Sequence, residues 1–585
     1  MCGIFGYRGD RDAVNIVFEG LKTLEYRGYD SWGITWMQDN KLSTLKEIGK
    51  LPTSIPQQKK SSLAIGHTRW ATHGGITHQN AHPHPDCTGK IAVIHNGIIE
   101  NYSNLKANLI LKGHVFLSET DTEVFPHLIE ELVKKMPFEL AVRKAFSELE
   151  GLNAFVILNS NDNKLHAIKN GSPMVIGAGG KGEYFVASDS AGIMKYTDNV
   201  LFVEDNVFLT ISNTISATNA AGQNIKLKFQ KYQWKKESPS KGKYEHFLIK
   251  EIADQPKCIQ RISEKDEGEI TAFADSIRKA FGTYLIGCGT ASYAALAGQY
   301  LFSTIAHKHV NFSVGSEFSY LQDFLTSKSV ILAISQSGET IDVIDPVTKA
   351  KKIGSKILSI TNGYGSTLFR ASDQSLLLDA GPEVAVVGTK SYTAMVALLL
   401  LLSYELKGDQ NQGKVLLKKA ARDISHTLTQ RLGKVKEASK IVSESETVFT
   451  IGRGISYALA LESALKIKET SLIHAEGFAG GELKHGVMAL IQKGTPCVVF
   501  APNDETLNDI LSNAQEIKTR GGFMIGVGPV KSGIFNLWIE TEDLGPATIL
   551  SQVVIAQLLA YYAALERGIE DPDKPRNLAK SVTVK

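Results

Sequence analysis

The feature that most constrains the fold is a duplicated strand–glycine–helix unit in the C-terminal half of the chain. An apolar strand, a Gly-x-Gly turn and a Ser-Tyr-Ala helix start occur at residues 284–294 and again at 449–458. Further apolar strands, such as 330–334, alternate with helix-like sequence. This alternation indicates a parallel sheet covered on both faces. We therefore expect two tandem α/β doubly wound domains, separated by helices between Gln410 and Ser443.

The N-terminal part, up to about Leu227, has a different pattern. Short alternating strands, such as 91–95 and 154–158, are joined by Gly and Asn turns, with helices expected only near 13–24 and 121–135. Strands paired mostly by turns indicate layered sheets of an α+β kind. The charged stretch that follows, 226–244, is interpreted as a domain linker, although its basic and aromatic residues leave a nucleic-acid patch as an alternative.

Length and composition define the broad class of the protein. A chain of 585 residues is too long for one core and predicts three or four domains. The 64 basic and 61 acidic residues give a net charge of only +3, so no overall basic field favours nucleic acid. We find neither an apolar run near the roughly 18 residues of a membrane span nor a signal-peptide pattern. We expect a cytoplasmic protein without a nucleic-acid or membrane partner.

The five cysteines are odd in number, far apart and never in a C-x-x-C pair, which argues against a disulfide framework and a zinc site. Only Cys2 has a chemical rationale, because removal of Met1 would leave its sulfur beside a free α-amine. A thiol pKa of about 8.5 and an α-amine pKa of about 7.7–8.0 let the amine accept the thiol proton. The alternative is a small buried residue of a first strand.

A second candidate site is the hydroxyl-rich loop 335–340, Ser-Gln-Ser-Gly-Glu-Thr, between a buried strand and a helix start. Backbone N–H groups at a helix N-terminus together with short hydroxyl donors suit a phosphate. No Gly-Lys-[Ser/Thr] follows, so the loop is not a nucleotide P-loop. An N-capping turn is the structural alternative.

A third candidate is the charged triplet Glu462, Lys466 and Glu469, whose spacing places all three on one helix face. A solvated salt-bridge stripe is the common reason for such spacing. The apolar residues around the triplet leave little room for an outward face, so we expect some of these charges in a pocket. The glycine-rich segment 476–486 is a further ionisable cluster that would let a ligand approach the backbone.

With these motifs in place, the whole chain from Cys2 to Val584 resembles the glutamine–fructose-6-phosphate aminotransferase (isomerising) family, the glucosamine-6-phosphate synthases. Its N-terminal part resembles class II glutamine amidotransferases, and the remainder resembles paired sugar isomerase (SIS) domains. The resemblance rests on these motifs: Cys2-Gly3-Ile4, Arg27–Ser31, His67–Gly74, His95–Asn101, Glu119–Glu123, Ser335–Thr340, Glu482–Gly486 and Arg576–Val584.

The resemblance implies an α+β N-terminal nucleophile (Ntn) hydrolase domain followed by two tandem α/β doubly wound SIS domains. The expected boundaries are 1–227 for the glutaminase, 228–245 for the linker, 246–425 and 426–570 for the SIS domains, and 571–585 for a C-terminal tail that closes the sugar site.

For the glutaminase, the resemblance implies that Cys2 attacks the side-chain amide of glutamine to give a thioester and ammonia. The Asn96 side chain and the Gly97 N–H would stabilise the oxyanion, a role in which losing one donor typically lowers the rate by about 10²–10³. Arg69 would bind the α-carboxylate of glutamine and Asp121 its α-amine. Trp70, Thr72, His73 and Gly97 complete the expected glutamine site. Without the family, Arg69 and Asp121 are plain surface charges and Asn96-Gly97 a hairpin turn.

For the acceptor, the resemblance implies fructose 6-phosphate. Lys580 would form a Schiff base with the opened ketose, Glu469 would move the proton from C1 to C2, and His485 would open the ring, with Lys466 and Glu462 assisting. The expected sugar-phosphate residues are Thr290, Ser335, Gln336, Ser337, Thr340, Val386, Glu462, Lys466 and Ala579.

The family also implies an ammonia channel gated by Trp70, a homodimer in which His485 reaches the partner's site, and a place at the start of hexosamine and UDP-N-acetylglucosamine biosynthesis. No metal or other cofactor is expected. A related glutaminase–SIS enzyme for another keto-sugar phosphate is the alternative. Ala291 and Gly388 stand where the family usually has serine, which bears on sugar-phosphate affinity. A sugar-sensing regulator would carry a helix-turn-helix, and a deaminase would not need an intact glutaminase site.

Overall fold

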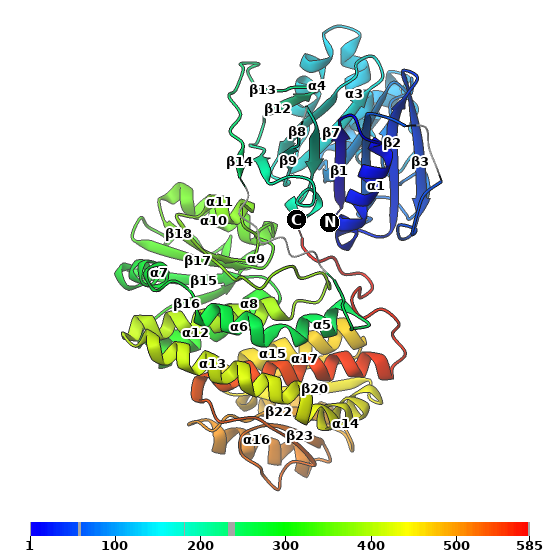
Figure 1. The fold of residues 1–585 in the computed structure, drawn as a ribbon. Coiled ribbons are helices and arrows are strands. Elements are labelled where there is room, and N and C mark those ends of the chain that lie inside the picture. Colours follow the sequence, from blue (N-terminus) through cyan, green and yellow to red (C-terminus); the bar gives the residue numbers. More distant parts are fainter. Residues whose placement is uncertain (1, 57–59, 181, 232–239, 583–585) are drawn as a thin grey trace. The chain divides into compact units, whose positions relative to one another are not determined.

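The computed structural model describes residues 2–56, 60–180, 182–231 and 240–582 (Figure 1). The chain divides into two compact units. One comprises Met1–Lys236 together with Ala579–Lys585, and the other comprises Glu237–Leu578. The expected linker at 228–245 falls where the first unit ends, although residues 232–239 lie outside the described part.

The first unit contains two antiparallel sheets with the orders β14-β11-β9-β10-β1-β4-β2-β3 and β13-β12-β8-β7-β6-β5. Their strands are β1 (Gly3–Arg8), β2 (Ser31–Gln38), β3 (Lys41–Ile48), β4 (Leu63–Arg69), β5 (His84–Pro85), β6 (Ile91–Gly97), β7 (Asn153–Asn159), β8 (Leu165–Asn170), β9 (Val175–Ala178), β10 (Tyr184–Ala187), β11 (Asn199–Phe202), β12 (Phe208–Ile211), β13 (Ile215–Thr218) and β14 (Gln230–Lys231).

Helices cover the outer faces of these two sheets (Figure 1). They are α1 (Ala13–Leu24), η1 (Glu25–Arg27), α2 (Tyr102–Leu111), α3 (Val124–Val133), α4 (Phe138–Ser147) and η2 (Ser190–Gly192). α1 packs on β1 and β4, and its first turn is capped by the Asp12 side chain, which accepts the Val14 N–H. The predicted helix at 13–24 is confirmed, and the one expected at 121–135 is shorter.

Alternation along single strands explains the layering of the first unit. In β7, Ala154, Val156 and Leu158 face the core between the sheets, whereas Phe155 and Ile157 face the core beneath α3 and α4. Side chains of a strand point alternately to opposite faces, so this strand is buried on both sides. The order helix, sheet, sheet, helix is the layered α+β arrangement that the sequence predicted.

The second unit contains two five-stranded parallel sheets with the orders β16-β15-β17-β18-β19 and β21-β20-β22-β23-β24. Numbered within each copy, both orders read 2-1-3-4-5, which is a doubly wound topology. The strands are β15 (Gly282–Gly287), β16 (Asn311–Val314), β17 (Ser329–Ser335), β18 (Lys356–Thr361), β19 (Gln374–Leu377), β20 (Thr447–Gly452), β21 (His474–Ala479), β22 (Pro496–Phe500), β23 (Phe523–Gly528) and β24 (Leu537–Glu540).

The helices of the second unit cover both faces of each sheet. They are α5 (Phe247–Ala253), α6 (Gln255–Ser263), α7 (Glu267–Lys279), α8 (Thr290–Thr304), α9 (Gly315–Phe318), α10 (Ile341–Ile353), α11 (Thr367–Ala371), α12 (Lys390–Lys407), α13 (Gln410–His426), η3 (Thr427–Arg431), α14 (Leu432–Ser443), α15 (Ile455–Ser471), η4 (Gly480–His485), η5 (Val487–Leu490), α16 (Leu507–Thr519), η6 (Gly545–Ala547) and α17 (Thr548–Glu566). The helices expected between Gln410 and Ser443 are present.

One hydrophobic core joins the two copies, with α8 against α15 and α15 against α17. Within the described residues, the segment Gly545–Glu566 has the length and hydropathy of a membrane span, but 89% of its most apolar window is buried, as in the central helix of a globular core. Gln552 and Gln557 interrupt the apolar run of this segment, so it does not stand out in the sequence as a membrane span.

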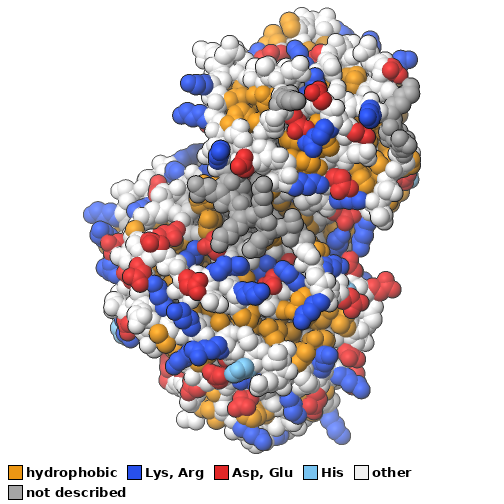
Figure 2. All heavy atoms as spheres, in the orientation of Figure 1, with side chains coloured by type: hydrophobic (Ala, Val, Ile, Leu, Met, Phe, Trp, Pro, Cys, Tyr) orange, Lys and Arg blue, Asp and Glu red, His pale blue; other side chains and the backbone are white. Residues whose placement is uncertain are grey.

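The surface carries charges of both signs. Within each unit, the face drawn in Figure 2 shows Lys and Arg side chains interspersed with Asp and Glu. This distribution agrees with the small net charge of the sequence. It offers no broad basic area on that face of the kind that nucleic acid would need.

Candidate active sites

Cys2 lies at the start of β1, where groups from three other segments surround it. Its Sγ accepts a hydrogen bond from the Trp70 N–H at 3.2 Å. Its carbonyl oxygen accepts from Asn96 Nδ2 at 2.9 Å and from Arg27 Nε at 3.3 Å. The fold therefore brings the predicted nucleophile and the predicted oxyanion residue Asn96 together from 94 positions apart.

Burial raises the pKa of the Cys2 thiol, although the Trp70 N–H and the Arg69 guanidinium act in the opposite direction. A thiol with a raised pKa is protonated near neutral pH and is a poor nucleophile. Reaction at this sulfur therefore requires a base. This requirement agrees with the sequence hypothesis that the α-amine of Cys2 takes the proton.

Asn96 is held by a histidine that the sequence analysis did not single out. His67 Nε2 lies 2.9 Å from the His95 carbonyl and 3.2 Å from Asn96 Oδ1, so this nitrogen carries the proton and donates to both. Burial lowers the pKa of His67 to about 3, which keeps the ring neutral. With Oδ1 facing His67, Asn96 presents its NH₂ group to Cys2. His67 belongs to the His67–Gly74 motif of the family resemblance, but that motif gives no role to its ring.

Gly97 follows Asn96 at the end of β6 with φ +145, and a Cβ there would lie 2.2 Å from the Leu152 carbonyl oxygen. Only glycine fits this position without strain. The backbone conformation at Gly97, the second residue of the predicted oxyanion pair, therefore admits only glycine.

Arg69 and Asp121, the predicted partners of the glutamine backbone, are both buried. Arg69 donates to the carbonyls of His73 and Gly74 at 2.6 and 3.1 Å and to that of Gly75 at 3.0 Å. The segment 73–75 is thus fastened to this guanidinium. Burial lowers the pKa of Arg69, and nearby carboxylates including Asp121 oppose that effect.

Asp121 accepts the Ile99 N–H at 2.8 Å just after β6. The remaining predicted glutamine residues are more open: Trp70 is half-buried with its ring edge-on to Tyr29, and Thr72 is exposed. His73 packs against Tyr102. Arg69 and Asp121 are therefore not the plain surface charges of the alternative interpretation.

In the second unit, Lys466 lies at the centre of a buried polar cluster. Its ammonium donates to Glu469 Oε2 at 2.7 Å, to Thr290 Oγ1 at 2.9 Å and to the Gly388 carbonyl at 3.1 Å. Glu462 Oε1 lies 3.4 Å from the same ammonium. The predicted charged triplet of α15 therefore faces inward, and the alternative of a solvated stripe is wrong.

The three protons of Lys466 are all directed at other acceptors, so Glu462 has the weakest contact with it. Burial raises the pKa of Glu462 to about 8, with Glu469 acting in the same direction and Lys466 opposing it. The two carboxylates raise the pKa of Lys466 to about 12. Burial therefore makes Glu462 hold its proton more firmly than an exposed glutamate does, beside the closer contact of Lys466 with Glu469. Glu462 Oε2 has no hydrogen-bond partner among the described residues, which leaves it open to a ligand.

The predicted phosphate loop joins β17 to α10. Ser335 Oγ accepts the Gly338 N–H at 3.1 Å and lies 3.2 Å from Thr340 Oγ1. Ser337 Oγ accepts the Glu339 N–H at 3.1 Å. The hydroxyls thus organise the loop, and Gln336 and Ser337 remain half-buried at its surface. The geometry suits both an anion cradle and the N-capping alternative.

The equivalent loop of the second copy, between β22 and α16, has a different chemistry. Its sequence is Ala-Pro-Asn-Asp-Glu-Thr, and Asp504 accepts both the N–H and the hydroxyl of Thr506, at 2.8 and 2.6 Å. A carboxylate at this position repels a phosphate. The duplicated fold therefore carries one hydroxyl-rich loop and not two.

The structure shows the surroundings of Ala291 and Gly388, the two positions where the family usually has serine. Ala291 is buried in the core of α8, and the neighbouring Ser292 donates its hydroxyl to the Gly289 carbonyl at 2.7 Å. The one donor of the Ser292 hydroxyl is thus used within the turn. A Cβ at Gly388 would make ordinary contacts of 3.5 Å with Ser391 Oγ and 3.6 Å with Thr290 Cγ2, so space for a side chain exists there.

The remaining predicted sugar residues are less closely grouped. The Val386 N–H donates to the Asp573 carbonyl at 2.8 Å, and the Asp573 carboxylate accepts the N–H groups of Phe247 and Leu248. The start of the expected tail is thereby fastened beside Val386. His485, in η4, is exposed. Ala579 and Lys580 belong to the other compact unit, and their role toward the sugar stays a prediction.

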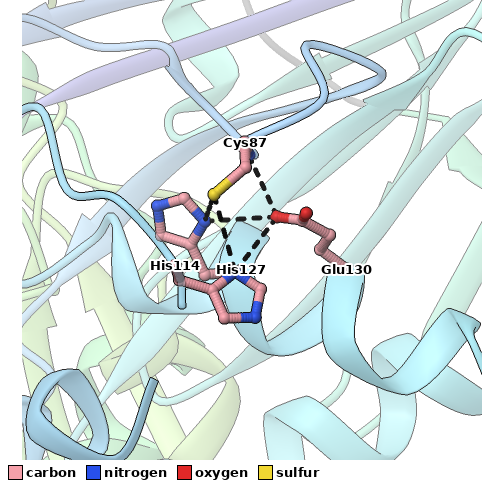
Figure 3. Close-up of side chains that lie close together, drawn as sticks. All are labelled: Cys87, His114, His127 and Glu130. Atoms are coloured by element: carbon pink, nitrogen blue, oxygen red, sulfur yellow. Dashed lines mark hydrogen bonds and ion pairs between the residues drawn. The ribbon is translucent and has the colours of Figure 1, made fainter. Parts of the chain in front are cut away.

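Two groups of side chains in the described residues are close enough to hold a metal ion. One consists of Asp423, His426 and Glu542, in which Asp423 is already paired with Arg431 at 2.5 Å. The other, Cys87, His114, His127 and Glu130, is shown in Figure 3. The cysteine spacing argues against a zinc site, but spacing says nothing of the histidines and the carboxylate that the fold brings to Cys87.

Comparison with known proteins supports the same two-part organisation. A glutamine amidotransferase domain model matches residues 67–195, and a SIS domain model matches residues 276–403 and 441–531. The fold and sites therefore define a glutamine amidotransferase joined to paired sugar isomerase domains.

Full-length relatives give the family. Proteins named glutamine–fructose-6-phosphate aminotransferase [isomerizing] from Pyrococcus horikoshii and Thermococcus kodakarensis are 41% and 40% identical, with complete coverage of both chains in each comparison. The chain belongs to the glutamine–fructose-6-phosphate aminotransferase (isomerizing) family, as the sequence motifs predicted.

Solved structures match the C-terminal half. The C-terminal domain of glucosamine-fructose-6-phosphate aminotransferase from Francisella tularensis is 30% identical, with a TM-score of 0.52, and covers 56% of this chain and 99% of its own. Tagatose-6-phosphate ketose/aldose isomerase from Escherichia coli has a TM-score of 0.50 at 17% identity and covers 58% of this chain and 99% of its own. The predicted SIS fold is confirmed.

Proposed function

We propose that this enzyme converts fructose 6-phosphate and glutamine into glucosamine 6-phosphate and glutamate. Family membership along the full length supports this reaction. The observation that carries it is the combination, in one chain, of Cys2 held by Asn96 and Trp70 with the buried Lys466 cluster of the paired SIS domains. The first supplies a site for amide hydrolysis and the second a site for proton transfer.

In the glutaminase step, the Cys2 sulfur forms a bond to the side-chain carbonyl carbon of glutamine. The α-amine of Cys2, exposed once Met1 is removed, takes the thiol proton and passes it to the leaving nitrogen. The C–N bond breaks, ammonia leaves, and water then hydrolyses the thioester to glutamate. Asn96 Nδ2 and the Gly97 N–H donate to the oxyanion, and Arg69 and Asp121 hold the two charged groups of the amino acid.

In the synthase step, Lys580 forms a Schiff base with the C2 carbonyl of the open ketose and is displaced by ammonia, which leaves an imine at C2. Glu469 removes a proton from C1 and returns it to C2, while the O1 hydroxyl proton is transferred to the imine nitrogen, so the imine becomes an amine and C1 becomes an aldehyde. Lys466 holds Glu469 in place for this task through its 2.7 Å hydrogen bond. His485 assists ring opening.

The phosphate of the substrate would bind in the Ser335–Thr340 loop, with Thr290, Val386, Glu462 and Ala579 around the sugar. Ammonia would pass between the sites without meeting bulk water, with Trp70 as the gate, because protonated ammonia is not a nucleophile. The exposure of His485 in one chain favours a homodimer in which this residue completes the partner's site. We place the enzyme in the cytoplasm, at the entry to hexosamine synthesis.

The test is to incubate the purified enzyme with glutamine and fructose 6-phosphate and to measure glutamate and glucosamine 6-phosphate separately. Cys2→Ala should abolish glutamate release, whereas Cys258→Ala, a buried cysteine of α6, should leave it intact. Unchanged glutamate release by Cys2→Ala would reject the nucleophile assignment. Amination of a different keto-sugar phosphate in preference to fructose 6-phosphate would overturn the substrate assignment.

A further inference from the structure

The side-chain cluster in Figure 3 joins three separate segments of the first unit. Cys87 lies in the turn between β5 and β6, His114 follows α2, and His127 and Glu130 occupy one face of α3. His114 and His127 are 6% and 1% exposed, and Glu130 is 9% exposed. Nothing in the glutaminase chemistry uses these residues.

The four potential ligand atoms form a compact set. Cys87 Sγ lies 3.6 Å from His114 Nδ1 and 3.4 Å from His127 Nδ1. Glu130 Oε2 lies 3.2 Å from His114 Nδ1 and 3.4 Å from His127 Nδ1. All four atoms lie within 4.8 Å of one another.

The four S···N and N···O separations match those of a tetrahedral zinc site. Zinc bonds of about 2.3 Å to sulfur and about 2.0–2.2 Å to nitrogen and oxygen, at tetrahedral angles, give S···N edges of about 3.5 Å and N···O edges of about 3.4 Å. Thiolate, imidazole and carboxylate together favour Zn²⁺ over the harder cations. We propose that Cys87, His114, His127 and Glu130 bind a structural Zn²⁺ ion.

The carboxylates on the far sides of the two histidine rings fit the same interpretation. His114 Nε2 lies 3.4 Å from Glu131 Oε2, and His127 Nε2 lies 3.6 Å from Glu123 Oε1. Zinc-bound histidines usually direct the other ring N–H at a carboxylate or carbonyl oxygen. The Val115 N–H also donates to Cys87 Sγ at 3.5 Å.

The carboxylates around the two rings also fit a bound cation. Each of the two imidazoles has a carboxylate oxygen near both of its nitrogens. A cation at the centre would be held by the two Nδ1 atoms, Cys87 Sγ and Glu130 Oε2, with Glu131 and Glu123 on the Nε2 sides of the rings.

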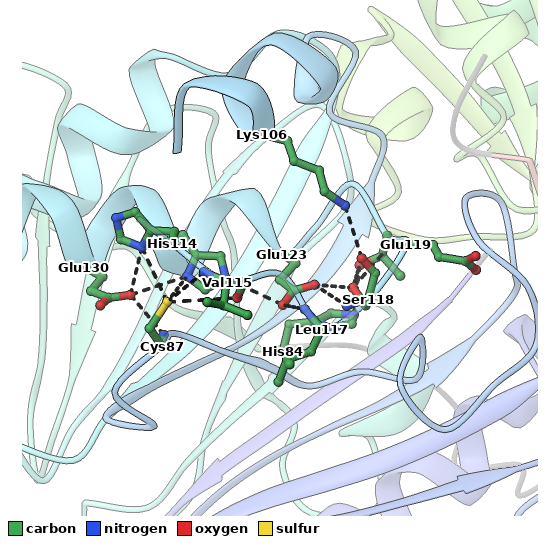
Figure 4. Close-up of polar contacts among 12 residues, drawn as sticks. His84, Cys87, Lys106, His114, Val115, Leu117, Ser118, Glu119, Glu123 and Glu130 are labelled. Carbon is green, nitrogen blue, oxygen red and sulfur yellow. Dashed lines mark hydrogen bonds and ion pairs between the residues drawn. The ribbon is translucent and has the colours of Figure 1, made fainter. Parts of the chain in front are cut away.

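The ion would stiffen the segment that carries Asp121. Beside the cluster, Glu123 accepts the N–H groups of Leu117 and Ser118, both at 2.7 Å, and the Ser118 hydroxyl at 2.6 Å (Figure 4). Ser118 in turn lies 2.9 Å from Thr120 Oγ1. The network runs from the metal ligand His127 through Glu123 to the residue before Asp121. If Asp121 binds glutamine as proposed, the zinc site positions one of its contacts.

Metal content tests the proposal directly. The purified full-length enzyme, reconstituted with zinc and dialysed, should hold one zinc ion per chain by elemental mass spectrometry. Cys87→Ser should lose most of it, and the matched variant Cys258→Ser should keep it. Replacing zinc by Co²⁺ should give the strong visible absorption of a tetrahedral site and a thiolate charge-transfer band, both absent in Cys87→Ser.

Substoichiometric zinc in the reconstituted enzyme, or full zinc content in Cys87→Ser, would overturn the proposal. If Cys87→Ser fails to fold, the cobalt spectrum of the unaltered enzyme decides, because an octahedral spectrum without the thiolate band excludes this ligand set. These readouts do not depend on catalysis. As a functional consequence, Cys87→Ser should raise the KM for glutamine about 10-fold with a smaller change in kcat. Zinc loss from Cys87→Ser without a change in the KM would support the metal site and overturn its link to Asp121.

Discussion

Lys466 and Thr290 join the two copies of the duplicated fold, because the Lys466 ammonium on α15 donates a 2.9 Å hydrogen bond to Thr290 Oγ1 on α8. Each residue lies on the helix that follows the Gly-x-Gly turn of its own copy. The contact is therefore both a structural link and part of the proposed synthase site.

Replacing Lys466 by Met should destabilise the second unit. The change leaves the Thr290 hydroxyl, the Gly388 carbonyl and Glu469 without their donor, and a buried acceptor left unsatisfied costs about 1–3 kcal/mol. Denaturant unfolding followed in the second unit should show this loss. Lys468→Met, an exposed position on the same helix, should change the free energy of unfolding by less than about 0.5 kcal/mol. Equal effects at the two positions would contradict the buried ion-pair geometry.

Glu462 should make stability depend on pH. Its pKa rises from 4.5 to about 8 on folding, so the folded protein binds more protons than the unfolded chain in this window. Stability contributed by the neutral carboxyl is therefore fully present below pH 4.5 and is lost as the pH rises through 8. Glu462→Gln, which stays neutral, should gain in melting temperature relative to the unaltered enzyme between pH 5 and 9. A pH-independent difference between the two proteins would show that Glu462 is already ionised.

Asn96→Ala should lower kcat for glutamine hydrolysis about 10²–10³-fold with little change in KM, because the amide donates chiefly to the oxyanion. Steady-state glutamate release measures both constants. Asn108→Ala, exposed on α2, is the matched control and should leave them unchanged. An effect confined to KM would assign Asn96 to substrate binding instead.

Gly388→Ser should strengthen binding of the sugar phosphate. The added Cβ fits without a close contact, and the hydroxyl supplies a donor where the family usually has serine. One hydrogen bond of about 1 kcal/mol corresponds to a roughly 5-fold lower KM for fructose 6-phosphate. Gly388→Ala adds the same Cβ without the hydroxyl and should leave the KM unchanged. If both substitutions lower it equally, packing and not hydrogen bonding is responsible.

The sequence predicted the local elements well because their signals are local. The helix at 13–24 and the recurring Gly-x-Gly turns follow from apolar spacing and turn chemistry over a few residues. The spacing of Glu462, Lys466 and Glu469 likewise put them on one face. That this face is buried, with Lys466 bonded to Thr290, depends on helices packed from distant parts of the chain.

Long-range placement explains what was missed. Cys87 lies in a turn 27 residues before His114, and His127 lies on α3. No periodic motif therefore links the three residues. His67 gives no sign in the sequence that its ring would orient Asn96. Both groups of residues meet because particular strands and loops are neighbours in the fold. The strand orders of the two sheets determine these neighbours.

The Asp504 loop has a consequence for how the duplicated half evolved and works. The loop of the first copy carries the Ser335 hydroxyl, whereas the equivalent loop of the second copy carries the Asp504 carboxylate. The two copies therefore differ in chemistry, like two different subunits of a heterodimer joined in one polypeptide. On this basis each chain should titrate with a single equivalent of sugar phosphate despite its two similar folds.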